Sequence, residues 1–395
     1  MRFLLLLALI FAACAPLRPL GPEADPAPAP KPVPTPEPIP EPIPAQDTTP
    51  APELPAIVHI INVGVGFEKN LAVIECPEQK WQFKAGENLG RKEIETAGDC
   101  KYGGKVYRGN WAVLSTDSGL AVINVVHIED YLKGVVPHEI GRLKREEIEA
   151  LKVQAIAART YAYSHIGSRK SQGFDIYADT RDQVYNGKAE EDPIANDAIL
   201  ATEGLVIKHE GKMIEAYYHS TCGGRTESVE VWGQENKAYL QPMSDSAEGK
   251  AFCELSRMMK WKETFTRAEL ITLFQKNAAD ARADRIFPFS KIEQILVTEK
   301  FPGGRVKRLV VFTDKGSFEV FGDKARWLFA RAGKILPSAL FAIAQSGNTF
   351  TITGSGFGHG IGMCQMGTRA RAKAGQSYEE ILKAYYTNVQ ILLIR

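Results

Sequence analysis

The chain has 395 residues, of which 48 are basic and 47 acidic, so its formal net charge is +1. This balance gives no electrostatic sign of nucleic-acid binding, because a protein that neutralises phosphates presents an excess of Lys and Arg. About 340 residues follow a proline-rich segment near the N-terminus, which is enough for one large domain or two smaller ones with a substantial core.

A short apolar run near the N-terminus predicts a signal peptide for export over residues 1–13. The run is too short to span a bilayer. Cys14 follows two alanines and so resembles the modified residue of a bacterial lipobox, which predicts cleavage before it and a lipid on it. The alternative is ordinary cleavage with Cys14 unmodified. We therefore expect a lipid-anchored protein on the extracytoplasmic face of the cell envelope.

Residues 14–56 contain the lipidated cysteine and a tether, since 16 of the 23 prolines lie there, many in an alternating X-Pro pattern. Such a segment forms polyproline helix and has no core. At ~3.1 Å per residue it reaches on the order of 100 Å, which lets a globular domain work away from the membrane. A proline-rich recognition ligand is the alternative.

Short apolar and alternating runs separated by Gly and Asp predict strands from residue 57 to about 127, and we place a β-rich N-terminal region at 57–118. Apolar and small residues at helical spacing, among them Ala155, Ala157 and Ala158, predict a helix from Glu146 to about Ser168. Runs at 205–207 and 213–218, joined by a Glu-Gly-Lys turn, predict a β-hairpin.

The C-terminal part, 119–395, is expected to contain further helices and strands, with an inserted α/β scaffold at 255–346 that carries no chemical motif. We expect a helix at 267–274, strands at 292–297, 306–312 and 317–321, a helix at 363–374, and a last helix opened by a capping box at 377–380. The predicted fold class is α+β: a mixed, β-rich lobe plus helices around a substrate groove.

Glu139 lies in an otherwise apolar segment shaped by Gly134 and Pro137. Burial disfavours the ionised carboxylate, so such a Glu can keep its proton near neutral pH and donate it to a substrate. The alternative is that a Glu shortly after a Pro belongs to the first turn of a helix, where it complements the helix dipole. Glu139 is our candidate acid catalyst.

Five cysteines follow Cys14, and the sequence-nearest pairs predict disulfides between Cys76 and Cys100 and between Cys222 and Cys253. Cys364 is then left over. His219 and Cys222 together suggest a Cys-His peptidase, but the expected disulfide removes that thiol. His219, Cys222, His359 and Cys364 are also zinc-ligand types, yet they lack the close spacing of a zinc motif. We expect no metal or other cofactor; the alternative is a zinc site, which requires the fold to gather these residues.

Two further constellations have a chemical interpretation. Arg159 stands on an otherwise small, apolar helix surface and needs an anionic partner: a substrate carboxylate, Glu139, or a structural salt bridge. The segment 174–185 combines three carboxylates with two tyrosines, a composition that suits a sugar-binding groove as well as a packed loop. The glycine-rich segment 354–362, which holds His359, matches no nucleotide-binding pattern.

Four stretches in this order resemble the stage II sporulation protein D and LytB family, the SpoIID domain of bacterial cell-wall enzymes. They are Ile128 to Glu139, Ala150 to Tyr161, Tyr217 to Gly224, and Gly356 to Gly367. The resemblance spans roughly residues 119–395 and implies that this part is the SpoIID-like catalytic domain. Residues 175 to 185 depart from the zinc-binding members of the family, since Tyr177, Arg181 and Asp182 stand there in place of His and Cys.

The resemblance implies a lytic transglycosylase that cleaves the glycosidic bond between N-acetylmuramic acid and N-acetylglucosamine in peptide-free peptidoglycan and leaves 1,6-anhydro ends. It implies Glu139 as the catalytic residue and Arg159, Tyr217 and His219 in substrate binding. His359 and Gln365 belong to the matching glycine-rich motif. The implied partners are glycan strands and an N-acetylmuramoyl-L-alanine amidase. The alternative function is a non-catalytic, glycan-binding or amidase-enhancing module.

Overall fold

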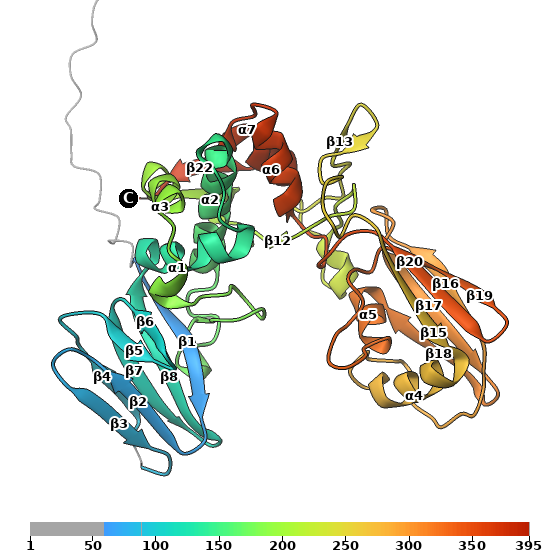
Figure 1. Cartoon of the computed structure of the whole chain (residues 1–395), viewed down its shortest axis with the longest axis horizontal. Coiled ribbons are helices and arrows are strands. Elements are labelled where there is room, and N and C mark those ends of the chain that lie inside the picture. Colours follow the sequence, from blue (N-terminus) through green and yellow to red (C-terminus); the bar gives the residue numbers. More distant parts are fainter. Residues whose placement is uncertain (1–58, 88, 395) are drawn as a thin grey trace, which may run out of the picture. The chain divides into compact units, whose positions relative to one another are not determined.

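The computed structural model describes residues 59–87 and 89–394 (Figure 1). The predicted signal peptide, Cys14 and the proline-rich tether lie outside the described residues. Within the described ranges, no helix is long and apolar enough to cross a membrane. Helices alternate with several separate sheets, which confirms the predicted α+β class.

The N-terminal part consists of two antiparallel sheets joined at their edges by short turns, as the alternating sequence predicts. The larger sheet has the order β4 (Arg91–Ile94), β7 (Asn110–Thr116), β8 (Gly119–His127), β1 (Ile60–Glu68), with the short parallel strand β9 (Ile176–Tyr177) at its edge. The smaller sheet has the order β3 (Lys80–Lys84), β2 (Leu71–Glu75), β5 (Cys100–Tyr102), β6 (Lys105–Tyr107). Ile61, Ile74 and Trp111 are fully buried between them.

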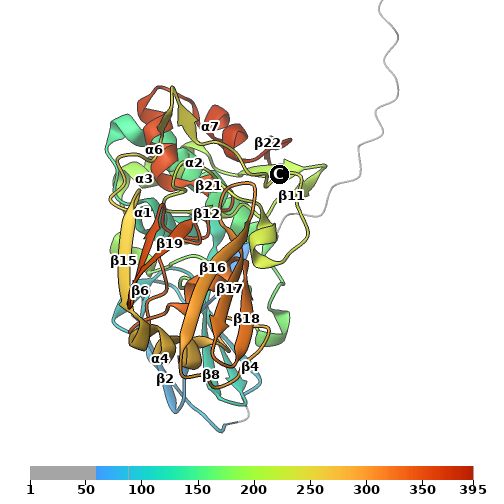
Figure 2. The ribbon, with the colours of Figure 1, turned by 90° about the vertical axis from the view of Figure 1, so that its right-hand side faces the viewer.

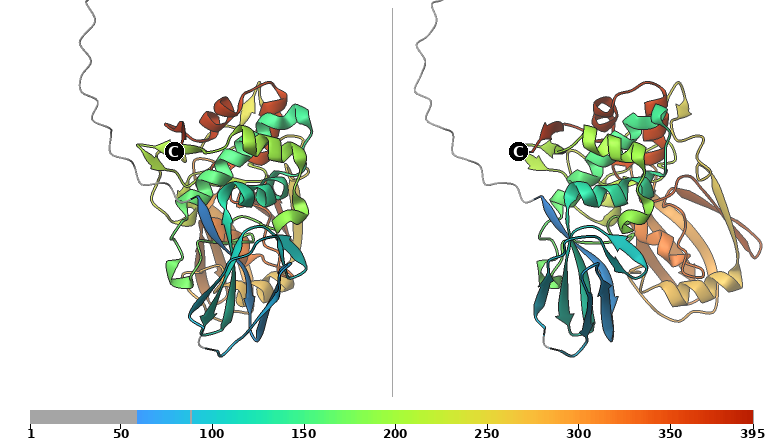
Figure 3. Two further views of the ribbon diagram at one scale, coloured as in Figure 1. Left: turned by 90° about the vertical axis from the view of Figure 1, so that its left-hand side faces the viewer. Right: turned by 60° about the vertical axis from the view of Figure 1, so that its left-hand side comes forward.

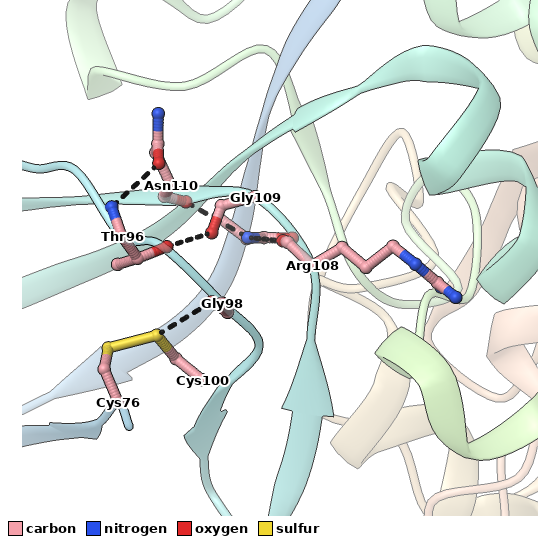
Figure 4. Close-up of a disulfide and its surroundings, with 8 residues drawn as sticks. Cys76, Thr96, Gly98, Cys100, Arg108, Gly109 and Asn110 are labelled. Carbon is pink, nitrogen blue, oxygen red and sulfur yellow. Dashed lines mark hydrogen bonds between the residues drawn. A yellow bond between two sulfur atoms is a disulfide. The ribbon is translucent and has the colours of Figure 1, made fainter. Parts of the chain in front are cut away.

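A disulfide joins Cys76 to Cys100 in this part of the protein, as predicted from sequence (Figure 4). It connects the end of β2 to the start of β5. The neighbouring loop is held by Thr96, whose backbone N–H donates to Asn110 Oδ1 at 3.0 Å and whose hydroxyl donates to the Gly109 carbonyl at 3.0 Å.

Five helices follow or flank the sheets: α1 (Ile128–Ile140), α2 (Ile148–Ser164), α3 (Pro193–Ala201), α6 (Gln365–Lys373) and α7 (Tyr378–Tyr385). Helix α2, the helix predicted over 146–168, contacts the other four, which Figure 3 shows gathered around it in green and red. Its buried alanines, with Ala155 and Ala158 fully enclosed, permit this close approach. The predicted capping box of α7 is present at Ser377 and Glu380.

Helix α1 contains the Gly134 and Pro137 that suggested an irregular segment. It forms because tertiary packing overrides the low helix propensity of both residues. Gly134 lies so close to the Gly187 carbonyl and the Tyr185 ring that a Cβ would collide with them. The helix starts where β8 ends, at the N-cap residue His127, whose ring accepts the Glu129 backbone N–H.

The predicted strand 213–218 is wrong as a single element. The hairpin of β10 (Leu205–His209) and β11 (Lys212–Met213) ends at Met213, and β10 pairs on its other side with β22 (Gln390–Leu393). The chain then forms β12 (Tyr218–His219), which pairs in parallel with β21 (Met363–Cys364). Backbone hydrogen bonding to a strand far along the sequence therefore outcompetes continuation of the hairpin.

The segment between about 255 and 354 has its own hydrophobic core, in which Phe274, Phe329 and Phe350 are buried. One sheet has the order β15 (Trp261–Thr266), β20 (Thr349–Gly354), β19 (Phe341–Ser346). The other sheet has the order β16 (Ile292–Lys300), β17 (Val306–Thr313), β18 (Gly316–Phe321). Helices α4 (Arg267–Asn277) and α5 (Ala325–Leu328) lie beside these sheets (Figures 1 and 2). The small hairpin of β13 (Ser246–Ala247) and β14 (Lys250–Ala251) precedes this segment. The expected helix and three of these strands are present; β15, β19 and β20 were not predicted.

Candidate active site

Glu139 lies in the last turn of α1 and its side chain is half-buried. Burial raises its pKa to about 7, while hydrogen bonds from the Val184 backbone N–H, at 2.9 Å from Oε1, and from the Gln365 side chain stabilise the ionised form. The first-turn alternative is wrong: at the C-terminal end of a helix the free carbonyl groups disfavour a negative charge. Glu139 can therefore hold or release a proton near neutral pH.

The groups closest to this carboxyl are polar but uncharged. Gln183 connects two tyrosines, since it accepts a hydrogen bond from Tyr131 Oη at 3.1 Å and donates one to Tyr218 Oη at 2.9 Å. Burial raises the pKa of both phenols well above their usual range, with the charge of Glu139 as the next cause. Both tyrosines stay protonated and therefore neutral, so neither phenol adds a charge beside Glu139.

A small cavity of about 150 Å³ opens beside the segment that binds Glu139. Residues from five separate parts of the chain line it: Tyr161, Thr180, Arg181, Asp182, Gln183, Tyr217, Tyr218, Trp232 and His359. Gln183 directly precedes Val184, the residue whose N–H binds Glu139. A larger cavity of about 590 Å³, lined by Lys260, Trp261 and Lys300 among others, lies on the sheet of β15, β19 and β20. Glu139 lines neither cavity, and only the smaller one adjoins the segment that binds it.

Asp182 is the carboxylate of this cavity, and its oxygens are already occupied. Oδ1 accepts hydrogen bonds from Tyr161 Oη at 2.8 Å and from Arg169 Nη2 at 2.9 Å, and Oδ2 accepts the Tyr177 backbone N–H at 2.8 Å. Its side chain is only 1% exposed. Asp175 is held in the same way by Asn62 and Gly167. Two of the three carboxylates of the predicted sugar-binding segment therefore stabilise the loop, and the third, Asp179, pairs with Arg181 at 2.6 Å.

The pairing of β12 with β21 brings His219 and His359 together, with ring centroids 5.4 Å apart. His359 Nδ1 accepts the Ile361 backbone N–H at 3.0 Å, so its Nε2 carries the hydrogen that it donates to the Tyr218 carbonyl at 2.9 Å. Burial lowers the pKa of His359 to about 4 and that of His219 well below its usual range. Both imidazoles are neutral at pH 7.

Tyr217 and His359 line the cavity, together with Trp232, the last residue of a short 3₁₀ turn at Val229–Trp232. The Trp232 ring lies 5.0 Å from Tyr217 and 4.9 Å from His359, measured between centroids. His219 is buried: its Nδ1 bonds the Ile361 carbonyl, and its Nε2 has no partner among the described residues.

Arg159 does not reach the cavity, so its predicted role in substrate binding is wrong. Its side chain is fully buried and forms a two-bond ion pair with Glu129, in which Nε and Nη2 lie 2.7 and 2.6 Å from the two carboxylate oxygens. The remaining donors reach the carbonyls of Leu205 and Ile199. The structural salt bridge is the correct one of the three alternatives.

The predicted disulfide between Cys222 and Cys253 is not formed, since their sulfurs lie 3.5 Å apart and both thiols are free. The physical reason is that Cys222 and Cys253 are not an isolated pair. A third thiol, Cys364, and the Asp245 carboxylate lie within 4.8 Å of both sulfurs. Cys222 is fully buried and its thiol bonds Asp245 and not His219, which argues against the peptidase alternative. The four suspected zinc ligands also separate into a histidine pair and a cysteine cluster.

Sequence inspection missed Trp232, Tyr218 and Tyr161 as cavity residues. Tyr161 ends the Arg159 motif at 150–161, and Tyr218 lies in the His219 motif at 217–224. Trp232 follows the second motif, in a Val-Trp-Gly segment. Exposed or half-exposed aromatics next to polar motifs are a sequence signal for sugar binding. Gln365 is present at the site, where it also donates to Gln154 at 3.3 Å.

The fold and the cavity define a class of site: a single half-buried carboxyl that titrates near neutrality, on an α+β scaffold, beside a cavity with aromatic walls. A family profile described as "Stage II sporulation protein" matches residues 116–209, which includes Glu139. A second profile, described as a domain of unknown function, matches residues 251–362.

Three relatives extend the match. An uncharacterised protein of Brachyspira hyodysenteriae is 30% identical over 300 residues, covering 76% of each chain. Stage II sporulation protein D of Bacillus subtilis is 31% identical over 67% of this chain and 74% of its own. The amidase enhancer of Bacillus subtilis is 30% identical over 65% of this chain, but only 39% of its own length is covered. The chain belongs to the SpoIID family, and this membership supports a role in the cell wall.

Proposed function

We propose that the protein is a lytic transglycosylase that cleaves the bond between N-acetylmuramic acid and N-acetylglucosamine in peptide-free peptidoglycan. The observation that carries the proposal is Glu139, a half-buried carboxyl whose pKa is raised to about 7 by burial. Asp182, the carboxylate in the adjoining cavity, is fully engaged in hydrogen bonds and offers no nucleophile or base.

A single carboxyl suffices for this reaction. A hydrolysing glycosidase normally uses two carboxylates, one as acid and one as base or nucleophile. In the proposed reaction Glu139 first donates its proton to the glycosidic oxygen as the bond to the muramoyl anomeric carbon breaks. The resulting carboxylate then takes the proton from the muramoyl 6-hydroxyl, whose oxygen forms the new bond to that carbon. Glu139 ends protonated, no water is consumed, and the nucleophile belongs to the substrate.

The hydrogen bonds around Glu139 fit both steps. The Val184 N–H and the Gln365 amide stabilise the carboxylate that forms after the first proton transfer. The absence of a nearby cation among the groups that perturb its pKa keeps the carboxyl protonated at the start. A pKa close to the working pH is the optimum for a group that acts first as acid and then as base.

The cavity supplies the sugar contacts in this proposal. Tyr217, Trp232 and His359 present neutral rings, on which sugar faces pack. Arg181 takes the role first expected of Arg159. It lines the cavity, its side chain is 53% exposed, and its guanidinium stacks 3.4 Å above the centre of the Tyr177 ring. Its present partner is the half-exposed Asp179, 2.6 Å from Nη2, with which a substrate carboxylate would compete. A guanidinium suits the lactyl carboxylate that is uncovered when the stem peptide is removed.

The direct test compares wild type, Glu139→Gln and the control Glu146→Gln on peptide-free glycan, with products analysed by mass spectrometry. Glu146 is an exposed carboxylate in the 3₁₀ turn Arg145–Glu147, directly before α2. We expect 1,6-anhydro ends from wild type and control, and a loss of at least about 10²-fold in rate for Glu139→Gln. Reducing ends would indicate a hydrolase, and equal rates for all three proteins would falsify the catalytic role of Glu139.

A second candidate function rests on the similarity to the amidase enhancer. In it the same cavity binds glycan without cleaving it and presents the strand to an N-acetylmuramoyl-L-alanine amidase. Glu139→Gln then retains full activity when added to an amidase digesting whole cell walls, whereas loss of Trp232 abolishes enhancement. Both functions place the protein outside the cytoplasmic membrane, tethered by the lipid proposed for Cys14.

A further inference from the structure

Four buried side chains unrelated to the Glu139 cavity converge on one point. Cys222, Asp245, Cys253 and Cys364 are each fully buried, and one ligand atom from each lies within 4.8 Å of all the others. They come from four places in the fold: the loop after β12, the residue before β13, the second residue after the β13–β14 hairpin, and the N-cap of α6. No sequence motif joins them.

The spacing matches ligands around one ion. Zinc binds sulfur at about 2.3 Å and carboxylate oxygen at about 2.0–2.2 Å, so tetrahedral ligand atoms lie about 3.5–3.8 Å apart. Cys222 Sγ is 3.5 Å from Cys253 Sγ and 3.3 Å from Asp245 Oδ2. A contraction of about 1 Å in the most distant pair brings all four atoms into that range.

Backbone amides already donate hydrogen bonds to two of the three sulfurs, as they would to thiolates. The Cys222 N–H donates to Cys364 Sγ at 3.2 Å, the Gly367 N–H donates to the same sulfur at 3.3 Å, and the Gly224 N–H donates to Cys222 Sγ at 3.3 Å. Donors aimed at sulfur favour the ionised form, which is the form that binds a metal. Gly224 has a φ of +94°, a conformation that suits glycine and turns this amide back toward the sulfur.

The carboxylate is oriented by an outer layer of hydrogen bonds. Arg371 donates through Nε and Nη2 to Asp245 Oδ1, at 3.1 and 3.0 Å, and Tyr385 Oη lies 3.0 Å from both oxygens. Oδ2 is thereby left facing the sulfurs. A Cβ at Gly367 would collide with that oxygen and with the Tyr385 hydroxyl, so glycine makes room for it. Metal ligands in proteins are commonly held by such partners.

We propose that Cys222, Asp245, Cys253 and Cys364 form a structural zinc site. Three soft thiolates select zinc over the hard cations magnesium and calcium, and four protein ligands leave no open position for catalysis. Two charges from zinc and one from Arg371 offset most of the four negative charges of the ligands. The site ties the β12 loop, the β13–β14 hairpin and α6 together, and so fixes Gln365, the residue after Cys364.

The first experiment needs no variant and no glycan. The full chain is purified without added reductant, dialysed against metal-free buffer, and assayed for zinc by mass spectrometry of the elements. We expect about one zinc per chain. Replacement by Co²⁺ should produce the thiolate charge-transfer band and the visible bands of a tetrahedral ion. A folded wild type that holds no zinc and gives no such spectrum overturns the proposal, as does a peptide map that finds Cys222 disulfide-linked to Cys253.

Matched variants locate the site. Cys253→Ser and Cys364→Ser should each lower zinc retention at least tenfold, while the double variant of Cys76→Ser and Cys100→Ser, which removes the distant disulfide, should keep it. Tyr385→Phe leaves all four ligands in place and should weaken zinc binding about tenfold. Zinc retention unchanged in both single cysteine variants would exclude these ligands. Glu139→Gln should hold zinc like wild type, so failure of the proposed reaction leaves this test unaffected.

Discussion

The hydrogen bond from Gln365 to Glu139 offers a quantitative test of the proton donor. In the variant Gln365→Met the side chain keeps its length but loses the amide that stabilises the ionised carboxylate. Because the lost interaction favours the charged form, the pKa of Glu139 must rise. The Val184 N–H remains in place and keeps the carboxyl oriented.

The magnitude follows from the charge of the acceptor. A hydrogen bond to a charged group contributes about 1.5–3 kcal/mol. Since about 1.4 kcal/mol corresponds to one pKa unit, the loss raises the pKa of Glu139 by about one to two units, from about 7 toward 8 or 9. The protonated, active form then persists to higher pH.

The assay is the pH dependence of kcat/KM on peptide-free glycan, which reports groups of the free enzyme. Wild type should lose activity above pH about 7, and Gln365→Met above pH about 8 to 9. The control Gln345→Met removes an exposed glutamine whose side-chain amide donates to the Gly347 carbonyl, far from Glu139 in the sequence, and it should keep the wild-type profile. An alkaline limb that stays in place or moves to lower pH in a folded Gln365→Met protein would refute the reasoning.

Three further predictions concern stability. Glu139→Gln should stabilise the protein at pH 8 by at most about 3 kcal/mol and leave its stability unchanged at pH 4. The native pKa of about 7 exceeds the unfolded value of 4.5, so the wild type loses stability as pH rises between these two values. Thermal melts at both pH values test this, and equal shifts in melting temperature at pH 4 and pH 8 contradict it. Arg159→Met should lower the free energy of unfolding by about 3–5 kcal/mol, because it leaves Glu129 as an unpaired charge. Denaturant titration measures this loss. A glycan-binding assay should show no specific loss of binding, which distinguishes a structural role from a substrate role. Replacing Cys76 and Cys100 by Ser removes a disulfide with a sequence separation of 24 and should lower the free energy of unfolding by roughly 3 kcal/mol. Thermal melting under non-reducing conditions measures the loss. An unchanged melting temperature would mean that the disulfide does not stabilise the protein.

Local patterns predicted the elements whose cause is local. Helix α2 follows from apolar and small residues at helical spacing, and the start of α7 follows from the Ser377 and Glu380 capping box. The β-rich region follows from short runs of alternating apolar and polar residues, which are separated by Gly and Asp. Helix α1 was missed because Gly134 and Pro137 disfavour a helix on their own, and only packing against Tyr185 and Gly187 makes the glycine useful there.

The candidate site divides in the same way. Glu139 stood out in the sequence because apolar neighbours surround it, and burial is what raises its pKa. The partner of Arg159 did not stand out, since Glu129 lies 30 residues earlier and belongs to another helix. The carboxylates of the 174–185 segment were given a sugar-binding alternative, but their hydrogen bonds to distant backbone and side-chain donors make them part of the loop's own structure.

The amino-acid sequence by itself determined the α+β class, the acidic residue in an apolar setting, and the order of motifs that places the chain in its family. These properties depend on composition and on spacing within a few residues. Only the tertiary structure decided which side chains meet: the parallel pairing of β12 with β21, the Gln365 amide against Glu139, and the three thiols around Asp245. Each of these arrangements brings together residues more than a hundred positions apart, since Cys364 joins three cluster members that lie between 222 and 253. Their free energy is gained only once the chain has folded around them.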